Sequence, residues 1–598
     1  MMHPEHEVFF SRIQQGLSKS ADLSKLPEWI SKNTRNPRKK EFRWSFAEHE
    51  FQIDIARDAT PDVAIRKCSQ VGLSELSVRI ALGIGFMRDL TVIYVLPTSK
   101  FASKFSKGRI DPVVNASPTL SPRKSKTSYS VDLKQIGDMI FYVAGASSSA
   151  DAISIPAQLL VRDEYDFGNQ AVLSNFDSRL GHNKDGDSFT RDFSTPTVAK
   201  FGIDKKFLAG HQAWYGVRHD RCGQIVVPKF LEDVCIPGFD GVAKDFEKYQ
   251  LDDPRYDVTH AFVRCPHCRH EITIQNLADP AKRMWIAQFP DRHSHSYQVQ
   301  PFDVPTINSP GRTLRQMEKY SLRRDWINFK VGEVYEDSGN SFNPALVDTY
   351  SCGKGIEPHP TELQSIGAVI GVDVGMVSWV VVGKRVNGQF RILYLEKILG
   401  GVENPDGLYL RVKFLMSAFS ARMGVMDSMP DFNTASRLCV ELTGRFFACE
   451  YAEKLQTELD TITLKEDKLV VRVHRNKRFD LLVSAYSKGE IRWCDSPELA
   501  TVKEHLQGLK KTRSAGESEE SAETLEQAAE TWQKIGEDHY LHALNYCYIA
   551  DELLGKLSAS ENPPCLPLPT KVSMGKRPEE DYRIPVRHGI VTTRGLAR

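Results

Sequence analysis

An acidic pair, Asp163-Glu164, follows the apolar run at residues 159–161. In nucleotide-hydrolysing α/β domains, a buried strand can end in such a pair. The first carboxylate then holds Mg²⁺ directly or through water, and the second orients the attacking water. A solvated strand end can carry the same two residues, so the pair indicates a nucleotide site only when a phosphate-binding loop accompanies it.

Such a loop is predicted upstream, at residues 67–74. The sequence KCSQVGLS has the spacing of G-x-x-x-x-G-K-[ST], but Lys67 stands at the position of the first Gly and Leu73 at that of the Lys. The loop follows a strand-like segment at 63–65 and opens a helical run at 75–83. An ordinary turn before a helix is the alternative.

The altered loop keeps most of the chemistry that phosphate binding needs. Backbone N–H groups around Gly72 and the helix N-terminus can surround phosphate oxygens. Ser74 can reach Mg²⁺, and Lys67 can supply the displaced cation. The predicted nucleotide-binding residues of the loop are Lys67, Cys68, Ser69, Gln70, Val71, Gly72, Leu73 and Ser74.

Two sulfur-rich pairs have the spacing of metal ligands, H-x-x-C at 219–222 and C-x-x-C at 265–268. One imidazole and three thiolates suit a structural, tetrahedral Zn²⁺ site. His267 or His270 could replace the histidine of the first pair, and a reduced, metal-free Cys pair is the alternative. A redox role is disfavoured because no βαβ thioredoxin pattern surrounds the motif. The predicted ligands are His219, Cys222, Cys265 and Cys268.

Three further carboxylates suggest a second centre. Asp373 lies within the apolar run at 370–375, where a lone inward carboxylate is costly unless it meets a metal or a partner. Glu441 is predicted at a strand end, and Asp538 opens a helix; Glu537 and Asp480 are alternatives to Asp538. Carboxylates converging on one sheet can hold two metal ions that activate water and stabilise a leaving 3′ oxygen.

Composition sets the broad class. The 598 residues are 41% hydrophobic and 26% charged, as in globular proteins, and the net charge of +1 places any nucleic-acid contact on a local patch. A basic stretch at 472–478 is one candidate, with a solvated strand edge as the alternative. No apolar run is long enough to span a bilayer and no signal-peptide pattern is present, and the scattered cysteines favour a reducing cytosol.

Apolar strands near residues 61–65, 91–96, 139–143 and 159–161 alternate with helical stretches, which predicts an α/β fold with a parallel sheet. Residues 117–130 are predicted to form a loop, residues 509–531 a mobile loop or exposed helix, and Asn387-Gly388 a hairpin turn. The predicted organisation is an N-terminal arm (1–45), a first domain (46–330) with the Cys/His insertion at about 211–275, a linker (331–360), a second domain (361–555) and a C-terminal tail (556–598).

With its Lys at the front of the loop, KCSQVGLSE resembles the large terminase subunits of tailed bacteriophages, especially the lambda-type branch. Three further stretches match this family in the same order: WSFAEHEFQIDIARD at 44–58, VLPTSKFASKFSKGRI at 95–110 and FSTPTV at 193–198. The CPHC element at 265–268 also occurs in the lambda branch. The resemblance spans roughly residues 40–555.

The resemblance implies a P-loop ATPase domain with a zinc-binding insertion, followed by an RNase H-like nuclease domain. ATP, Mg²⁺ or Mn²⁺, and Zn²⁺ are the expected cofactors. The family often has Asp or Asn near the position of His542, so this chain departs from the pattern there. The resemblance assigns adenine contact to Gln52, Mg²⁺ to Asp163, catalysis of ATP hydrolysis to Glu164, γ-phosphate sensing to Ser194 and Thr195, and the nuclease metals to Asp373, Glu441 and Asp538.

The resemblance also implies partners. These are double-stranded DNA, a portal protein, a small terminase subunit, and a ring of about five copies on the procapsid, in the host cytoplasm and without a membrane. A transition-state cation is expected from Arg66 or Arg109. The alternatives are a helicase-nuclease acting in DNA repair or recombination, and an idle structural protein with a degenerate loop.

Overall fold

The computed structural model describes residues 22–559, apart from residues 40, 148–154, 182–187, 336–338, 340, 359–366, 453–461, 466–469 and 514–529. The chain forms two compact units. Unit 1 contains Met1–Asn343 and Leu506–Glu537, and unit 2 contains Pro344–His505 and Asp538–Arg598. The second segment of unit 1 therefore interrupts the chain of unit 2, an arrangement that the predicted domain order did not include.

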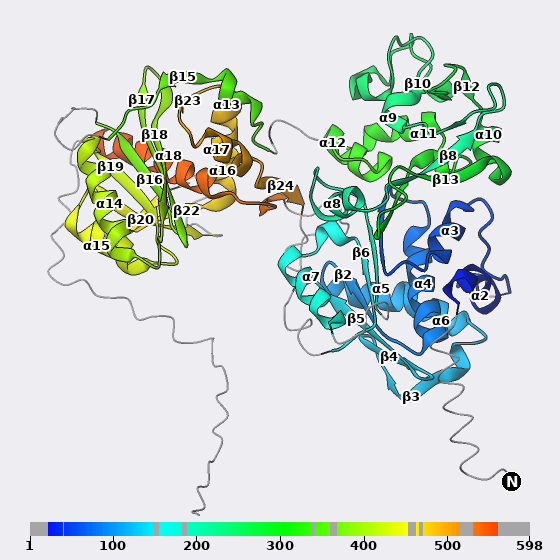
Figure 1. Ribbon diagram of the computed structural model, residues 1–598. Helices are drawn as coiled ribbons and strands as arrows, with labels where there is room; N and C mark the ends of the chain where they lie inside the picture. The colour runs from blue at the N-terminus through cyan, green and yellow to red at the C-terminus, as the bar shows by residue number, and fades with distance from the viewer. Residues whose placement is uncertain are drawn as a thin grey trace, which may run out of the picture. The chain divides into compact units, whose positions relative to one another are not determined.

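Unit 1 is built on an 11-stranded sheet with the order β13-β8-β14-β1-β7-β6-β2-β5-β4-β3, and β9 pairs with β8 (Figure 1). The strands from β8 to β5 are parallel, and antiparallel strands extend both edges. The strands of this sheet are β1 (Asp62–Lys67), β2 (Thr91–Leu96), β3 (Lys124–Tyr129), β4 (Leu133–Ile136), β5 (Met139–Gly145), β6 (Leu159–Asp163), β7 (Phe189–Ser194), β8 (Ala213–Arg218), β9 (Ile225–Val226), β13 (Arg283–Ala287) and β14 (His295–Val299).

Helices cover both faces of this sheet. On β2, Val92 and Tyr94 share a core with α4, whereas Ile93 and Val95 share a second core with α7. Burial on both faces explains why this strand is apolar without alternation. The helices of unit 1 are α2 (Leu26–Asn33), α3 (Phe51–Arg57), α4 (Leu73–Arg88), α5 (Ser99–Phe105), α6 (Asp111–Ala116), α7 (Gln170–Asp177), α8 (Gly202–Ala209), α9 (Phe230–Asp233), α10 (Ile274–Ala278), α11 (Pro310–Arg315) and α12 (Arg323–Trp326).

The predicted strands and the parallel sheet of the first domain are confirmed. Three expectations need correction. Residues 124–129, predicted as loop, form the half-exposed edge strand β3, whose polar sequence suits a sheet edge. Helix α2, in the predicted N-terminal arm, packs through Leu26 and Ile30 into the core beside α4. Residues 509–531, predicted as a mobile loop or exposed helix, begin and end in the paired strands β24 (Leu509–Arg513) and β25 (Glu530–Lys534).

Two smaller sheets complete unit 1. The Cys/His insertion contains β10 (Val234–Cys235), β11 (Phe262–Arg264) and β12 (Glu271–Ile272), paired antiparallel. Its apolar core continues into α11 and α12 through Leu314 and Trp326. The second small sheet is the β24–β25 hairpin.

Unit 2 contains a mixed sheet of nine strands in the order β15-β23-β18-β17-β16-β19-β20-β22-β21 (Figure 1). β18, β17 and β16 are antiparallel neighbours, and β16, β19, β20 and β22 are parallel. The strands are β15 (Ser351–Lys354), β16 (Val369–Asp373), β17 (Val377–Val386), β18 (Gln389–Leu399), β19 (Met423–Asp427), β20 (Phe446–Ala452), β21 (Ile462–Lys465), β22 (Val470–His474) and β23 (Ile491–Asp495).

Helices α14 and α15 pack their apolar side chains on this sheet, and α18 lies along β16, β17 and β19. Asn387 and Gly388 both have positive φ, 52° and 80°, as a two-residue hairpin turn requires, so that prediction is confirmed. The prediction of an α/β chain with a second, strand-rich domain is confirmed as well, and the sheet of that domain is mixed. The helices are α13 (Ala345–Thr349), α14 (Pro405–Ala418), α15 (Phe432–Glu441), α16 (Arg475–Ser487), α17 (Leu499–Leu506) and α18 (His539–Ala559).

The predicted C-terminal tail lies outside the described residues from residue 560 onward. A search of the described helices for a segment both long and apolar enough to cross a bilayer found none.

Helix α18 approaches β16 so closely that residue 371 must be glycine. A Cβ at Gly371 would lie 2.1 Å from the backbone N of Cys547 and 2.2 Å from the O of Ala543. We therefore expect Gly371→Ala to lower the free energy of unfolding by about 3 kcal/mol, because two backbones must separate. Urea unfolding of the full chain measures this.

The matched control is Gly555→Ala in the same helix, where an added Cβ would meet nothing within 4 Å. That change should be neutral or stabilise the protein by about 0.5–1 kcal/mol. Equal stability of the Gly371→Ala variant and the wild type would contradict the packing of α18 on β16.

Candidate functional sites

The loop at residues 67–74 joins β1 to α4 at the carboxyl edge of the parallel sheet. Gln70 and Gly72 have φ values of 63° and 76°, which turn the chain sharply before the helix. The N–H of Cys68 donates to Val299 O at 3.1 Å, and the N–H of Ser69 donates to Phe329 O at 2.7 Å. The loop is therefore fixed by neighbouring segments rather than by its own turns.

Helix α4 begins at Leu73 and runs for 16 residues. The N–H groups of its first turn, including those of Leu73 and Ser74, cannot bond within the helix, and the helix dipole adds partial positive charge there. An anion placed over this turn would meet aligned donors.

Lys67 ends β1 and points at the acidic pair. Its Nζ lies 2.8 Å from Glu164 Oε1 and 4.0 Å from Asp163 Oδ1, and its side chain is only 5% exposed. Burial lowers the pKa of Lys67, but the charges of Glu164 and Asp163 outweigh burial and raise it, so the ammonium stays charged. The structure thus brings together three residues that the sequence analysis had connected only by motif.

Asp163 and Glu164 are held in different ways. Asp163 ends β6, is 1% exposed, and accepts a hydrogen bond from the hydroxyl of Tyr94 at 3.3 Å. Glu164 has a φ of 57°, a left-handed conformation that is rare for this residue type. Burial raises the pKa of Glu164, and the charge of Lys67 opposes this rise.

Gln52 on α3 reaches the other side of the loop. Its Nε2 donates to Val71 O at 3.0 Å, and a Cβ on Gly72 would come within 3.0 Å of the same nitrogen. Its Oε1 is buried and has no hydrogen-bond partner among the described residues. A buried acceptor without a donor is costly, and this oxygen can accept a hydrogen bond from a ligand.

The predicted sensing segment leaves β7 beside the acidic pair. Ser194 Oγ donates to Thr195 O at 2.8 Å and accepts from the N–H of Asp166 at 3.1 Å. Thr195 Oγ1 is buried and has no partner among the described residues. Both predicted residues therefore lie against the turn that follows Glu164.

Asp166 ties this turn to the sensing segment, a role that sequence reasoning missed. Its carboxylate accepts from the N–H and the hydroxyl of Thr197, both at 2.9 Å, and from the N–H of Ile203 at 2.6 Å. Burial raises the pKa of Asp166 to about 7, against these hydrogen bonds. The pattern D-E-x-D, which ends at Asp166, is the sequence signal that could have identified this residue.

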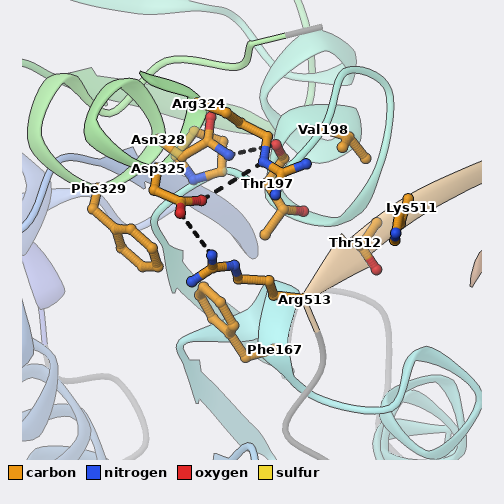
Figure 2. Close-up of a pocket in the computed structure, with 11 residues that line it drawn as sticks. Phe167, Thr197, Val198, Arg324, Asp325, Asn328, Phe329, Lys511, Thr512 and Arg513 are labelled. Atoms are coloured by element: carbon orange, nitrogen blue, oxygen red, sulfur yellow. Dashed lines mark hydrogen bonds and ion pairs between the residues drawn. The ribbon is translucent and has the colours of Figure 1, made fainter. Parts of the chain in front are cut away.

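The far side of the same segment is held by η13 (Ile327–Val331) and by the β24–β25 hairpin. Figure 2 shows Asn328 beside Thr197, and Arg513 of the hairpin beside Asp325. Asn328 Nδ2 donates to Thr197 O at 2.7 Å, and Lys510 Nζ donates to Ala199 O at 3.0 Å. Arg513 pairs with Asp325 at 2.6 Å, next to Asn328. Residues 197–199 are thus fixed by contacts from two separate parts of the chain.

The structure separates the two candidates for a transition-state cation. Arg66 is buried and donates to Gln298 and Asp204, which gives it a structural role rather than an exposed position. Arg109 is 48% exposed and pairs with Glu75 at 2.9 Å, one turn into α4. A further cation that sequence reasoning missed is Lys330, whose Nζ donates to Ser69 Oγ in the loop at 3.0 Å.

The Cys/His residues form one cluster in the insertion. Ligand atoms of His219, Cys222, Cys265 and Cys268 all lie within 4.8 Å of one another. His219 Nδ1 lies 3.5 Å from Cys222 Sγ and 3.4 Å from Cys268 Sγ. Its Nε2 lies 3.0 Å from the backbone O of Glu271, an arrangement in which Nε2–H donates and Nδ1 faces the sulfurs.

The alternatives to His219 are not among the four residues whose ligand atoms lie within 4.8 Å of one another. His267 is exposed, and His270 directs Nδ1 at Cys268 O, 2.8 Å away. Hydrogen bonds from the neighbouring backbone, led by His270, lower the pKa of the Cys268 thiol to about 6. Four converging soft ligands with one thiol easily ionised make this a candidate metal site.

In unit 2, carboxylates gather at the carboxyl edge of the sheet. Asp373 ends β16 and Asp427 ends the adjacent parallel strand β19, with Val372 paired to Met426 just before them. Burial, with a contribution from the charge of Asp373, raises the pKa of Asp427. Asp427 Oδ2 accepts from the Tyr546 hydroxyl at 2.9 Å.

The third carboxylate comes from the start of α18. Asp538 is 3% exposed, and His542 Nε2 lies 3.2 Å from its Oδ2. The neighbouring His539 Nδ1 lies 2.8 Å from Asp373 Oδ2. The charge of His542 also acts on Asp427, so α18 brings its side chains to both strand ends.

The expectation that Glu441 ends a strand is wrong. Glu441 is the last residue of α15, it is exposed, and it pairs with Lys413. Because α15 runs back from the end of β19 to the start of β20, Glu441 lies toward the opposite edge of the sheet from Asp373. The residue missed was Asp427, although MGVMD has the same apolar-run-then-acid pattern as LLVRD.

The basic stretch at 472–478 is largely paired within the unit. Arg472 pairs with Glu450 at 3.0 Å. The fully buried Arg478 pairs with Glu552 at 2.8 Å. These two arginines therefore serve the fold and do not form a continuous phosphate-binding surface.

Residues 43–284 match the family model described as phage terminase large subunit gpA, ATPase domain. No curated protein matches the whole sequence significantly. Among solved structures, the HK97 bacteriophage large terminase is 10% identical and covers 88% of this chain and 98% of its own, with a TM-score of 0.47. The ATPase domain of the Thermus phage P74-26 large terminase is 14% identical, over 50% and 96%, at 0.29.

The human cytomegalovirus terminase nuclease domain is 10% identical and covers 35% of this chain and 93% of its own, with a TM-score of 0.22. At these scores the structural likenesses carry no further conclusion. The family match covers the loop at 67–74, the pair Asp163-Glu164 and the Cys/His cluster. Residues 43–284 are therefore similar to the ATPase domain of the phage terminase large subunit gpA family.

Proposed function

We propose that this protein is an ATP-driven motor that moves double-stranded viral DNA into a procapsid, and a metal-dependent nuclease that cuts concatemeric DNA. The observation that carries the motor is the buried contact of Lys67 with Glu164 and Asp163 at the N-terminus of α4. This contact supports the displaced lysine as the cation of the phosphate-binding loop.

The residues fit ATP. Lys67 and the first-turn N–H groups of α4 would bind the phosphates, and the orphaned Oε1 of Gln52 would accept from the adenine amino group. Asp163 and Ser74 would hold Mg²⁺, which would neutralise negative charge on the phosphates. Glu164 would take a proton from the attacking water, and its contact with Lys67 holds it in place beforehand.

Hydrolysis would then be sensed on β7. Thr195, with its unpartnered hydroxyl, supports a γ-phosphate contact. Asp166 would pass a change at the acidic pair to Thr197 through its direct hydrogen bonds.

Glu164→Gln should lower the rate of ATP hydrolysis by about 10²–10⁴-fold, because the general base is lost while the shape is kept. Lys67→Ala should lower it by at least about 10²-fold, because a buried cation leaves the phosphate site. Phosphate release measures hydrolysis, and protection of DNA from nuclease inside procapsids measures packaging.

The control is Lys107→Ala, an exposed lysine of the same domain, which should keep wild-type rates. Wild-type turnover in both Lys67→Ala and Glu164→Gln would show that ATP is hydrolysed elsewhere. Loss of ATP-driven uptake with retained strand separation would favour the helicase-nuclease alternative.

For the nuclease we assign Asp373, Asp427 and Asp538 as the metal-binding carboxylates, with Asp427 in place of Glu441. Buried carboxylates whose charges disfavour one another, as Asp373 does for Asp427, fit a centre completed by cations. Among the described residues only the Cys/His cluster has three or more ligand atoms within 4.8 Å of one another. Two metal ions about 3.5–4 Å apart need a wider set of ligands than one ion does.

Asp427→Asn and Asp373→Asn should each abolish Mg²⁺- or Mn²⁺-dependent cutting of plasmid DNA, because the metal ions lose a charged ligand, while ATP hydrolysis continues. Glu441→Gln is the matched control and should cut at the wild-type rate. Loss of cutting in Glu441→Gln together with normal cutting in Asp427→Asn would restore the original assignment.

The Cys/His cluster supports a structural zinc site, with His219 as the fourth ligand. One imidazole and three thiolates are the ligand set of a closed tetrahedral site, and the core around the cluster continues into α11 and α12. Zinc would therefore hold the insertion on the ATPase domain.

Metal analysis should find about one zinc per chain. Cys265→Ser should lose most of it and unfold at a lower temperature, because three ligands cannot hold the insertion as tightly. Cys352→Ser, a half-buried cysteine in unit 2, should keep the zinc. If the native protein contains no zinc, the assignment of this site is wrong.

The lambda-type branch, the portal protein, the small terminase subunit, a ring of about five copies and the host cytoplasm belong to the same proposal. They rest on the family resemblance alone. The helicase-nuclease remains the second candidate, with no specific observation in its favour.

A further inference from the structure

Histidines accompany the carboxylates at the start of α18. Asp538, His539 and His542 lie within one turn, and each imidazole contacts a different carboxylate. His542 Nε2 faces Asp538 Oδ2 at 3.2 Å, whereas His539 Nδ1 faces Asp373 Oδ2 at 2.8 Å. Either imidazole could therefore act together with a carboxylate, and the surroundings of the two rings can be compared directly.

His542 is the better positioned of the two rings. Its side chain is 15% exposed, against 29% for His539. Aromatic rings of Phe479, Tyr451 and Tyr546 surround it, with centroids 5.2, 5.6 and 6.3 Å away. Such packing fixes the direction of Nε2.

The opposite ring nitrogen of His542 has a dedicated partner. Nδ1 lies 2.9 Å from the hydroxyl of Tyr451, and that hydroxyl accepts from Asn545 Nδ2 at 3.1 Å. Histidines that bind metals almost always donate their second N–H to an oxygen acceptor. In the tautomer in which Nδ1–H donates to Tyr451, Nε2 is left as an electron-pair donor. His539 has instead a flat stack on Trp379, with ring centroids 5.8 Å apart and planes at 7°.

We propose that His542 Nε2 is a nitrogen ligand at the carboxylate centre, beside Asp538. This inference rests on the proposed nuclease function. Mg²⁺ is bound almost entirely through oxygen, whereas imidazole is a good ligand for first-row transition ions. The mixed set therefore selects Mn²⁺ over Mg²⁺ at the position next to Asp538.

A simpler arrangement would give His542 only the task of orienting Asp538 by a hydrogen bond. The two arrangements differ in a measurable property. A nitrogen ligand couples magnetically to the bound Mn²⁺, and a hydrogen-bonded histidine one shell further out does not give the same direct coupling. The readout is therefore independent of DNA cutting.

The experiment uses the full chain with its Cys/His cluster loaded with zinc and without nucleotide. Mn²⁺ is added, its affinity is measured by electron paramagnetic resonance, and pulsed measurements detect ¹⁴N coupling. Asp427→Asn assigns the signal to the carboxylate centre, since it should weaken Mn²⁺ binding there. His542→Asn and His542→Gln should abolish the coupling and weaken Mn²⁺ binding by about 10–100-fold, with a smaller effect on Mg²⁺.

His539→Asn is the matched control and should retain the nitrogen coupling. Mn²⁺ binding without coupling, or coupling that persists in both His542 variants, would overturn this inference while leaving the nuclease centre in place. Absence of any Mn²⁺ binding that depends on Asp427 would overturn the proposed nuclease centre as well. Thermal unfolding of each variant confirms that the metal is lost from a folded protein.

Discussion

Unit 1 depends on one buried ion cluster, in which a single ammonium meets two carboxylates. Removing charged groups from water costs several kcal/mol for each ion, so Lys67, Asp163 and Glu164 are tolerable only together. The sheet makes this possible. β7 separates β1 from β6, and parallel strands bring their carboxyl ends to one edge. Lys67 therefore reaches across one strand to Glu164, and the loop, α4 and the turn after β6 are positioned by that contact.

Unit 2 poses a different electrostatic problem. Asp373 and Asp427 bring negative charge to the carboxyl ends of two adjacent parallel strands, and Asp538 precedes the helix that packs on them. Two histidines and Tyr546 are among the groups that contact these three carboxylates. Imidazole and hydroxyl groups can exchange a hydrogen bond for a metal ion, whereas a buried arginine would neutralise a carboxylate permanently.

The segment after β7 is held by hydrogen bonds from two sides. Asp166 holds Thr197 from the side of the acidic pair, and Asn328 and Lys510 hold residues 197–199 from the other side. Because the hairpin strand β24 belongs to a part of the chain more than 300 residues away, local sequence gave no sign of it. A segment fixed by discrete hydrogen bonds on both sides has few intermediate positions.

Local patterns determined much of this protein. Patterns within a few residues identified the buried strands β2 and β6 by their apolar runs, the hairpin turn by the pair Asn387-Gly388, and the candidate metal ligands by their C-x-x-C spacing. The displaced Lys67 and the pair Asp163-Glu164 were identified because each lies at a strand end marked by its own neighbours. The tertiary structure alone decided which distant groups meet. It placed Glu441 at the end of a helix and Asp427 at the end of a strand. It placed His219, and not His270, in the Cys/His cluster, and it made β24 and β25 part of unit 1. These outcomes depend on the strand order and on the direction of the crossover connections. Both arise from packing between segments hundreds of residues apart, so the sequence around each residue carries no signal of them.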